Sequence, residues 1–209
     1  MLSPGPRPPL TPAQALALVR GCRARGAILV EGWSDEAALG AVAANEAAML
    51  ADRGIVVLPL GGVTNIGKFA GALDTLPTPP RLCGLYDASE EAVALRHLRH
   101  AGWSALTTRA AAAAAGFFAC ERDLEDELIR AAGAEAVECL LAQEDDLASF
   151  RRFQRQPEHR GRAVQAQLHR FMGTRAGRKE RLAFLVASSL PASRVPAPLR
   201  ALLRYALAQ

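Results

Sequence analysis

Ala27-Ile28-Leu29-Val30-Glu31-Gly32-Trp33-Ser34-Asp35 is the stretch of sequence that decides the fold. Its first four residues are apolar and have the composition of a buried strand. Gly32 permits a sharp turn, and Ser34 is a suitable cap for a helix whose apolar residues, Met49 among them, share one face. A strand, a tight turn and a helix in this order predict that Glu31 lies at the carboxyl edge of a parallel sheet, where open α/β sheets bind ligands.

Two more apolar segments end in a similar way. Residues 55–60 (IVVLPL) precede Gly61-Gly62, and residues 82–86 (LCGLY) run into Asp87. A single carboxylate after a strand is as typical of a solvated turn as of a site. Two carboxylates at one edge of a sheet repel each other unless a cation lies between them, and oxygen ligands suit a hard cation such as Mg²⁺. The pattern therefore favours a metal site at this edge.

The motifs Val30-Glu31-Gly32-x-Ser34-Asp35, Leu60-Gly61-Gly62 and Tyr86-Asp87-Ala88-Ser89 resemble those of the TOPRIM domain. This domain occurs in topoisomerases, bacterial primases and nucleases of the OLD (overcoming lysogenization defect) family. The Glu-Gly-x-Ser-Asp form and the later acidic segment 123–128 (DLEDEL) are most similar to the OLD-type branch. The resemblance implies an α/β, Rossmann-like TOPRIM fold, with a mainly parallel sheet of four to five strands flanked by helices.

The sequence divides into three parts. Residues 1–25 are expected to be a Pro-rich tail, disordered up to Leu10, followed by an N-terminal helix. Residues 26–133 correspond to the TOPRIM domain, with a fourth strand expected over residues 102–107 and a fifth over residues 116–120. The strand signal disappears after Gly133, so residues 134–209 are expected to form a basic helical extension that packs on the domain.

The resemblance also implies roles for individual carboxylates. Glu31 is expected to act in acid–base catalysis or metal binding and Asp87 to hold Mg²⁺ or Mn²⁺. Asp35, Asp123 and Glu125 would complete a site for one or two ions. One departure stands out, because Ser89 replaces the second Asp of the family's Asp-x-Asp motif. Glu90 is then the candidate to reach inward in its place; otherwise the second ion is weakly held or activity is reduced.

The charge of the chain is unevenly distributed. Residues 150–209 carry thirteen Lys or Arg and two acidic residues, a net charge of +11, whereas residues 1–149 carry twelve basic and nineteen acidic residues, a net charge of −7. This asymmetry indicates an acidic catalytic part joined to a part that contacts nucleic acid. The alternative is a solvated Arg-rich surface of no special function. The candidate nucleic-acid contacts are Lys68, Arg175, Arg178 and Arg181.

Lys179 is a further catalytic candidate. It opens a helix after a glycine-punctuated turn and is one of two lysines in a chain that otherwise uses Arg. OLD-type proteins often place a functional Lys near the end of the domain, and a compact ammonium suits charge that develops at phosphorus. The competing interpretation is a solvent-facing residue at a helix start. The catalytic role requires the C-terminal helices to fold back toward Glu31 and Asp87.

The predicted function is that of a metal-dependent phosphodiesterase or endonuclease, acting on DNA in preference to RNA. OLD nucleases usually carry an ABC-type ATPase, and no P-loop motif occurs here, so the ATPase is expected as a separate chain. A homodimer is left open. The alternatives are a catalytically weakened TOPRIM module that binds nucleic acid or nucleotides, and another phosphoryl-transfer enzyme of primase-like or RNA-processing type.

The remaining features indicate a cytoplasmic protein with no membrane partner. No signal peptide is visible, and no apolar run approaches the roughly 20 residues that span a bilayer. The four cysteines show no CxxC pair and are expected to be reduced thiols, with Cys83 and Cys120 in the core. The four histidines lack metal-ligand spacing, so no metal role is expected for them.

Overall fold

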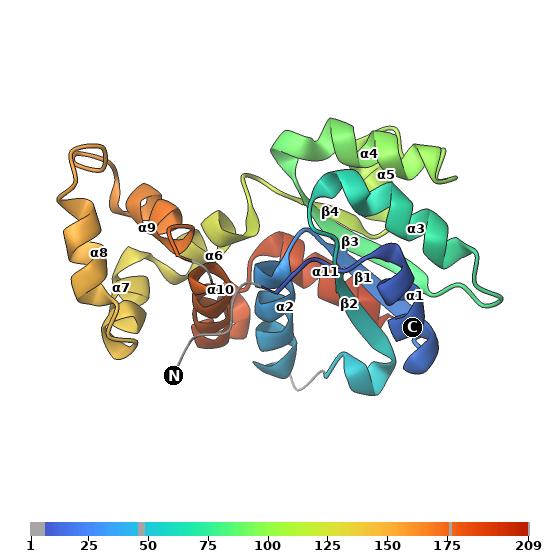
Figure 1. The fold of residues 1–209 in the computed structure, drawn as a ribbon, viewed down its shortest axis with the longest axis horizontal. Coiled ribbons are helices and arrows are strands. Elements are labelled where there is room, and N and C mark those ends of the chain that lie inside the picture. The colour runs from blue at the N-terminus through green and yellow to red at the C-terminus, as the bar shows by residue number, and fades with distance from the viewer. Residues whose placement is uncertain (1–6, 46–48, 176, 209) are drawn as a thin grey trace.

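The computed structural model describes residues 7–45, 49–175 and 177–208. A four-stranded parallel sheet lies at its centre, with the strand order β2-β1-β3-β4 (Figure 1). The strands are β1 (Gly26–Val30), β2 (Ile55–Pro59), β3 (Arg81–Asp87) and β4 (Phe117–Cys120). Val30 pairs with Pro59, and Asp87 pairs with Cys120. The carboxyl ends of all four strands therefore meet at one edge, as the sequence predicts.

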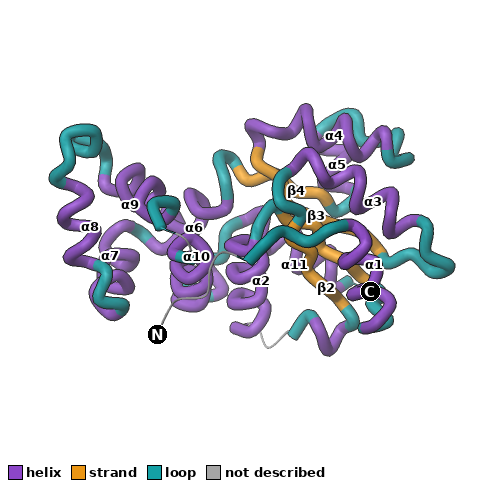
Figure 2. Tube along the Cα trace, in the orientation of Figure 1, coloured by secondary structure: helices purple, strands orange, loops and turns teal. Residues whose placement is uncertain are grey.

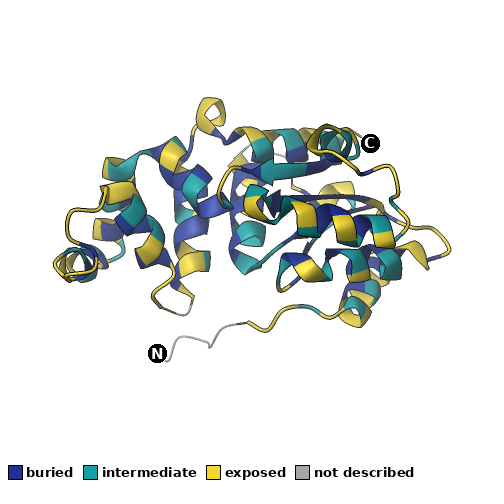
Figure 3. Ribbon diagram, turned by 90° about the horizontal axis from the view of Figure 1, so that it is seen from above, coloured by how far each residue is buried: buried dark blue, intermediate teal, exposed yellow. Residues whose placement is uncertain are grey.

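The sheet is covered on both faces. Alternation along β1 places Ile28 and Val30 in one apolar core and Ala27 and Leu29 in another, because successive side chains of a strand point to opposite faces. Figure 3 shows these buried strands between outer helices that are exposed on their far sides. On the Leu29 face lie α1 (Pro12–Gly21), α3 (Ile66–Asp74), α4 (Glu91–His100) and α5 (Arg109–Ala114).

The other face is covered by helices from distant parts of the chain. They are α2 (Trp33–Asn45), α6 (Leu124–Ala132), α10 (Arg178–Ser189) and α11 (Ala197–Leu207). α10 packs along α2, and α11 packs on β3 and β4. The C-terminal helices therefore fold back onto the sheet, which is the condition that a catalytic Lys179 requires.

Between α6 and α10 the chain forms a helical lobe. It consists of α7 (Ala134–Gln143), α8 (Leu147–Gln154) and α9 (Val164–Met172), and it lies at the end of the molecule away from the sheet (Figure 2). Phe150, Phe153 and Phe171 form its aromatic core, with ring centroids 5.1–6.4 Å apart. α9 also contacts α6, so the lobe is joined to the carboxyl edge of the sheet through α6.

The fourth strand expected over residues 102–107 is wrong. This segment forms turns and irregular backbone. Its apolar residues serve the core instead: the ring of Trp103 meets that of Phe117 edge-on at 5.3 Å, and Leu106 is buried. The side chains of Trp103 and Leu106 thus pack beside β4 without joining the sheet. The sheet has four strands, the lower of the two numbers expected.

Three further expectations are corrected near the N-terminus. The part of the Pro-rich tail that the structure describes is packed rather than disordered, since Arg7 pairs with Glu180 and the indole of Trp33 donates a hydrogen bond of 3.1 Å to the Pro8 carbonyl. α1 ends at Gly21, before the expected Arg25. Met49 lies beyond α2 and is 54% exposed, so it does not belong to that helix's buried face.

The buried positions of two cysteines agree with the sequence-based expectation. All four cysteines are free thiols, and Cys83 and Cys120 are buried in the core. Among the described residues, no helix combines the length and the apolar character that crossing a bilayer demands.

Candidate metal centre

Glu31 and Asp87 lie at the ends of the two central strands of the sheet. Glu31 is the first residue after β1, and Asp87 is the last residue of β3, which pairs directly with β1. The close approach of these strands depends on Gly84, because a Cβ there would lie 2.4 Å from the Leu29 carbonyl oxygen. Carboxylate oxygens of Glu31, Asp87 and Glu90 all lie within 4.8 Å of one another. The strand ends therefore present a cluster of three carboxylates.

Glu90 reaches this cluster through a 3-10 turn over Ala88–Glu90 that directly follows β3. The turn carries Glu90 back toward the strand end, whereas Ser89 is exposed and is not part of the cluster. The Ser that replaces the second Asp of the usual motif is thus accompanied by a carboxylate one residue later. Glu90 therefore offers a carboxylate oxygen at the position where the usual motif has its second Asp.

Asp35 and Glu125 extend the acidic surface of the site. Asp35, in the first turn of α2, accepts a hydrogen bond of 2.7 Å from the backbone N–H of Gly32. Glu125, in the first turn of α6, is 2% exposed, and its Oε1 atom has no hydrogen-bond partner within the described chain. A buried carboxylate oxygen without a partner is costly unless a cation or donor reaches it. Glu31, Asp35, Asp87, Asp123, Glu125 and Lys179 line one cavity of 250 Å³.

Lys179 is the cation of this cavity. Its Nζ lies 3.2 Å from Oε2 of Glu125, and its side chain is 54% exposed. Burial by itself lowers the pKa of Lys179, but the carboxylates of Glu125 and Asp35 outweigh burial and raise the pKa above its usual value. Lys179 is therefore a charged ammonium that faces both the carboxylates and the opening of the cavity.

Three carboxyls of the site, those of Asp87, Asp35 and Glu31, have raised pKa values. Burial, followed by the charge of Glu31, raises the pKa of Asp87 to about 7. Burial, followed by the charge of Glu125, raises the pKa of Asp35 to about 8. Burial and the neighbouring Glu90 also raise the pKa of Glu31. Raised values in a cluster of this kind mark a site that is electrostatically unsatisfied without a cation.

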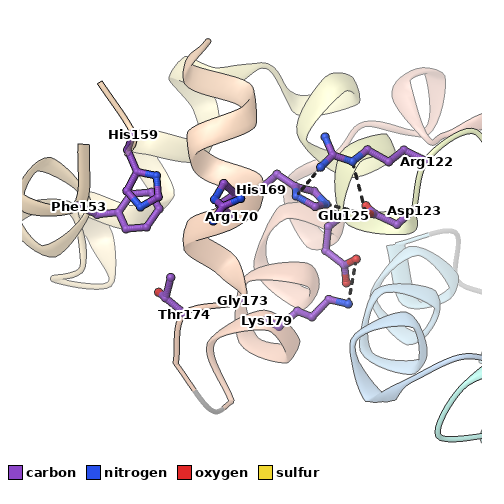
Figure 4. A pocket seen from close by; sticks show the side chains of 10 residues that line it. All are labelled: Arg122, Asp123, Glu125, Phe153, His159, His169, Arg170, Gly173, Thr174 and Lys179. Carbon is purple, nitrogen blue, oxygen red and sulfur yellow. Dashed lines mark hydrogen bonds and ion pairs between the residues drawn. The ribbon is translucent and has the colours of Figure 1, made fainter. Parts of the chain in front are cut away.

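Asp123 is held by a residue that the sequence does not identify. It caps α6 by accepting a hydrogen bond of 2.8 Å from the Asp126 N–H, and its Oδ2 lies 2.6 Å from Nε2 of His169 on α9 (Figure 4). Burial favours the neutral acid, but these two hydrogen bonds outweigh it and lower the pKa of Asp123. No spacing rule links Asp123 to a histidine 46 residues away, so only the fold reveals the pair.

The candidate nucleic-acid residues differ in their placement. Arg178 is 4% exposed, forms a two-bond ion pair with Asp146 at 2.9 and 3.1 Å and covers the ring of Phe171. Its guanidinium is buried in this ion pair, so the prediction that Arg178 contacts nucleic acid is wrong. Arg181 is 48% exposed but pairs with Asp146 and Glu144.

Lys68 and Arg175 are both exposed. Lys68 donates a hydrogen bond of 3.1 Å to the side chain of Asn65 at the start of α3. Arg175 lies in the turn between α9 and α10. Neither lines the cavity of the clustered carboxylates, so both stay predictions as nucleic-acid contacts.

Comparison with known families agrees with this geometry. Residues 24–87 match the family described as "Overcoming lysogenization defect protein-like, TOPRIM domain". The matched segment runs from the entry of β1 to Asp87 and so contains the two strand ends that carry Glu31 and Asp87. Residues 24–87 therefore have the sequence features of an OLD-like TOPRIM domain. No curated protein sequence matches it significantly.

The similarity extends to the fold outside the matched segment. The C-terminal region of the Xanthomonas campestris pv. campestris OLD protein, in the structure phased with platinum, superposes with a TM-score of 0.68 at 22% identity, covering 89% of this chain and 93% of that chain. The C-terminal region of the Burkholderia pseudomallei OLD protein gives a TM-score of 0.65 at 21% identity, covering 88% and 98%. These neighbours share the TOPRIM sheet and the helices around it.

The residues present fit a divalent cation. TOPRIM domains typically bind such ions, and the donor set here consists of carboxylate oxygens, which are the ligands that Mg²⁺ and Mn²⁺ prefer. The unpartnered Oε1 of Glu125 and the raised pKa values of Asp35 and Asp87 are further signs that the negative charge of these carboxylates lacks a positive partner. An OLD-like TOPRIM domain is a nucleic-acid-processing module, which agrees with the basic character of residues 150–209.

Proposed function

We propose that the protein is a metal-dependent phosphodiesterase that cleaves DNA. The observation that carries the proposal is the convergence of Glu31, Asp87 and Glu90 within 4.8 Å at the carboxyl edge of the sheet. Three clustered carboxylates, two of which (Glu31 and Asp87) have raised pKa values, lie near the half-exposed ammonium of Lys179 and form a site that binds cations and the phosphate between them. A site built only for stability would pair these charges.

The residues divide the chemical work. Glu31, Asp87 and Glu90 would hold one Mg²⁺ or Mn²⁺ ion, and Asp35, Asp123 and Glu125 would hold a second. Bound cations of this kind polarise a phosphodiester and lower the pKa of water. Lys179 faces the same cavity, where its ammonium neutralises charge on the phosphate without the fixed fork of an arginine. His169 holds the Asp123 carboxylate in place from α9.

Two kinds of partner complete the proposal. The basic surface after residue 150 contacts DNA in preference to RNA. An ABC-type ATPase would supply ATP hydrolysis to this domain; the 209 residues themselves contain no Gly-x-x-x-x-Gly-Lys-Ser/Thr motif. Purified protein alone is then expected to cleave DNA without any response to ATP.

A cleavage assay tests the proposal. Plasmid and linear DNA are incubated with the protein in Mg²⁺, in Mn²⁺ and in EDTA, and the same reactions are run with Asp87→Asn. The matched control is Asp52→Asn. Asp52 is an exposed carboxylate in the turn before β2 and does not belong to the cluster. Cleavage in either metal, its loss in EDTA and in Asp87→Asn, and its retention in the control are expected.

The same assay distinguishes this nuclease from the alternative, a module that binds nucleic acid without cleaving it. Ser89 in place of Asp favours a module that binds nucleic acid but has lost cleavage, and the position of Glu90 in the cluster argues against that loss. DNA binding without cleavage in Mg²⁺ or Mn²⁺ would leave the binding module as the correct description.

A further inference from the structure

The cavity of the metal centre continues into the helical lobe. A second cavity of 530 Å³ shares Asp123, Glu125 and Lys179 with the carboxylate site and runs along α9 (Figure 4). A third cavity of 440 Å³ shares Phe153, His159 and Thr174 with the second. Because each cavity shares lining residues with the next, the three adjoin one another in a row. We call the second and third cavities together the lobe track.

Arginines without an ionic partner line this track. Arg170 lies on the wall of the second cavity, and Arg152 and Arg175 lie on the wall of the third. No ion pair joins any of the three to a carboxylate within the described residues. Two other arginines on these walls are paired, Arg122 with Asp123 and Arg178 with Asp146, and the third cavity also has one exposed acid, Glu158. Unpaired guanidinium groups along one concave surface repel each other, and a polyanion relieves that repulsion.

The wall shared by the two cavities is aromatic and has an unsatisfied polar atom. The rings of Phe153 and His159 are stacked with centroids 3.7 Å apart, as Figure 4 shows. His159 is 5% exposed, and its Nδ1 has no hydrogen-bond partner within the described chain. A buried ring nitrogen of this kind costs free energy unless a ligand meets it. Arginines on both sides of a flat ring pair are the combination that holds phosphates and bases together.

We propose that the lobe track binds a single, unpaired DNA strand and leads it to the metal centre. The unpaired arginines would hold successive phosphates, and a base would lie against the Phe153–His159 wall, within reach of Nδ1 of His159. The volumes of the two cavities suit one or two nucleotides, and a base can lie against the Phe153–His159 wall only if it is unpaired. The inference rests on the proposed function and adds the substrate class: DNA with an unpaired strand at the site of cleavage.

Binding in EDTA tests the track apart from cleavage. Fluorescence anisotropy of a labelled single strand of about 12 nucleotides, and of the duplex of the same sequence, is measured over a range of salt concentrations. Arg170→Gln/Arg175→Gln removes two charges from the track. Arg194→Gln/Arg200→Gln removes two exposed arginines that line neither cavity and is the matched control.

The wild-type chain should bind the single strand more tightly than the duplex. The track variant should weaken single-strand binding on the order of tenfold and reduce the slope of log K against log salt by about 1.4, at roughly 0.7 per phosphate contact. The control should leave both unchanged. Equal losses in the two variants, equal losses for single strand and duplex, or no single-strand binding by the wild type would overturn the inference.

The two proposals fail in different ways. Metal-dependent cleavage that does not respond to the track variant on a substrate with an unpaired strand contradicts the track alone. Salt-dependent binding of the single strand without any cleavage in Mg²⁺ or Mn²⁺ contradicts the proposed function and leaves the track in place.

Discussion

At the scale of single residues, the ionised forms of the site's carboxyls are unfavourable in the absence of a cation. Asp35 shows this most clearly, since burial and the charge of Glu125 raise its pKa from 3.8 to about 8. An acid whose pKa is higher in the folded than in the unfolded state contributes stability at low pH and loses that contribution as pH rises through the folded value. The metal-free protein should therefore become less stable between about pH 4 and pH 8.

Asp35→Asn should remove this loss. The amide oxygen still accepts the Gly32 N–H, but the buried negative charge is gone. In EDTA at pH 8 the variant should melt at a higher temperature than the wild type, by about 2–4 °C for each kcal/mol regained, and the difference should shrink at pH 6. Thermal melts followed by circular dichroism measure it. A lower melting temperature for the variant at pH 8 would mean that Asp35 is stabilised by partners that the account omits.

Glu90 and Ser89 give a second test at this scale. Glu90 belongs to the carboxylate cluster and Ser89 is exposed beside it. Glu90→Gln should lower Mn²⁺ affinity by at least about tenfold, which corresponds to about 1.4 kcal/mol, whereas Ser89→Ala should change it little. Isothermal titration calorimetry compares the two. The reverse order of effects would show that residue 89 keeps the metal role that Asp has in the usual motif.

At the scale of elements, α10 brings a cation from the C-terminal part of the chain to the sheet edge. It packs along α2 and sets Nζ of Lys179 3.2 Å from Glu125. Lys179→Ala should lower the cleavage rate by about a hundredfold or more and DNA affinity only slightly, and Lys179→Arg should not restore the rate. Single-turnover cleavage and anisotropy separate the two quantities. Normal cleavage by Lys179→Ala would reduce this residue to surface charge.

α9 acts on the site through His169. The imidazole lies 2.6 Å from Asp123, which caps α6, so the helical lobe fixes the orientation of a candidate metal ligand. His169→Ala should weaken Mn²⁺ binding by about ten- to a hundredfold, the usual cost of losing such an orienting partner, while Arg170→Ala next to it should not. Calorimetric titration of both variants measures this. Equal Mn²⁺ affinity in His169→Ala and the wild type would show that Asp123 is either oriented by other groups or not a ligand.

At the scale of the whole molecule, local pattern determines most of the fold. The strands around Glu31 and Asp87 follow from apolar runs and glycine turns, and their parallel pairing brings the two carboxylates together as predicted. The pattern fails where tertiary packing decides. Residues 102–107 read as a strand but fill a gap in the core, and Arg178 reads as a nucleic-acid contact but is buried against Asp146.

The site shows the same division. Glu31, Asp87 and Glu90 are local to two strand ends and could be named from the sequence. His169 could not, because its contact with Asp123 depends on how α9 packs against α6, which no local pattern encodes. The lobe track likewise depends on the packing of α8 and α9, which places unpaired arginines on one concave surface.

The central claim is that the strand-end carboxylates hold a divalent cation. Crystals soaked in Mn²⁺ and measured at the manganese absorption edge test it most directly, because the anomalous signal locates the ion without reference to activity. The account predicts a peak among the carboxylates of Glu31, Asp87 and Glu90, at about 2.2 Å from their oxygens, and its loss in Asp87→Asn. An ion bound elsewhere, or no ion at these residues at saturating Mn²⁺, would contradict it.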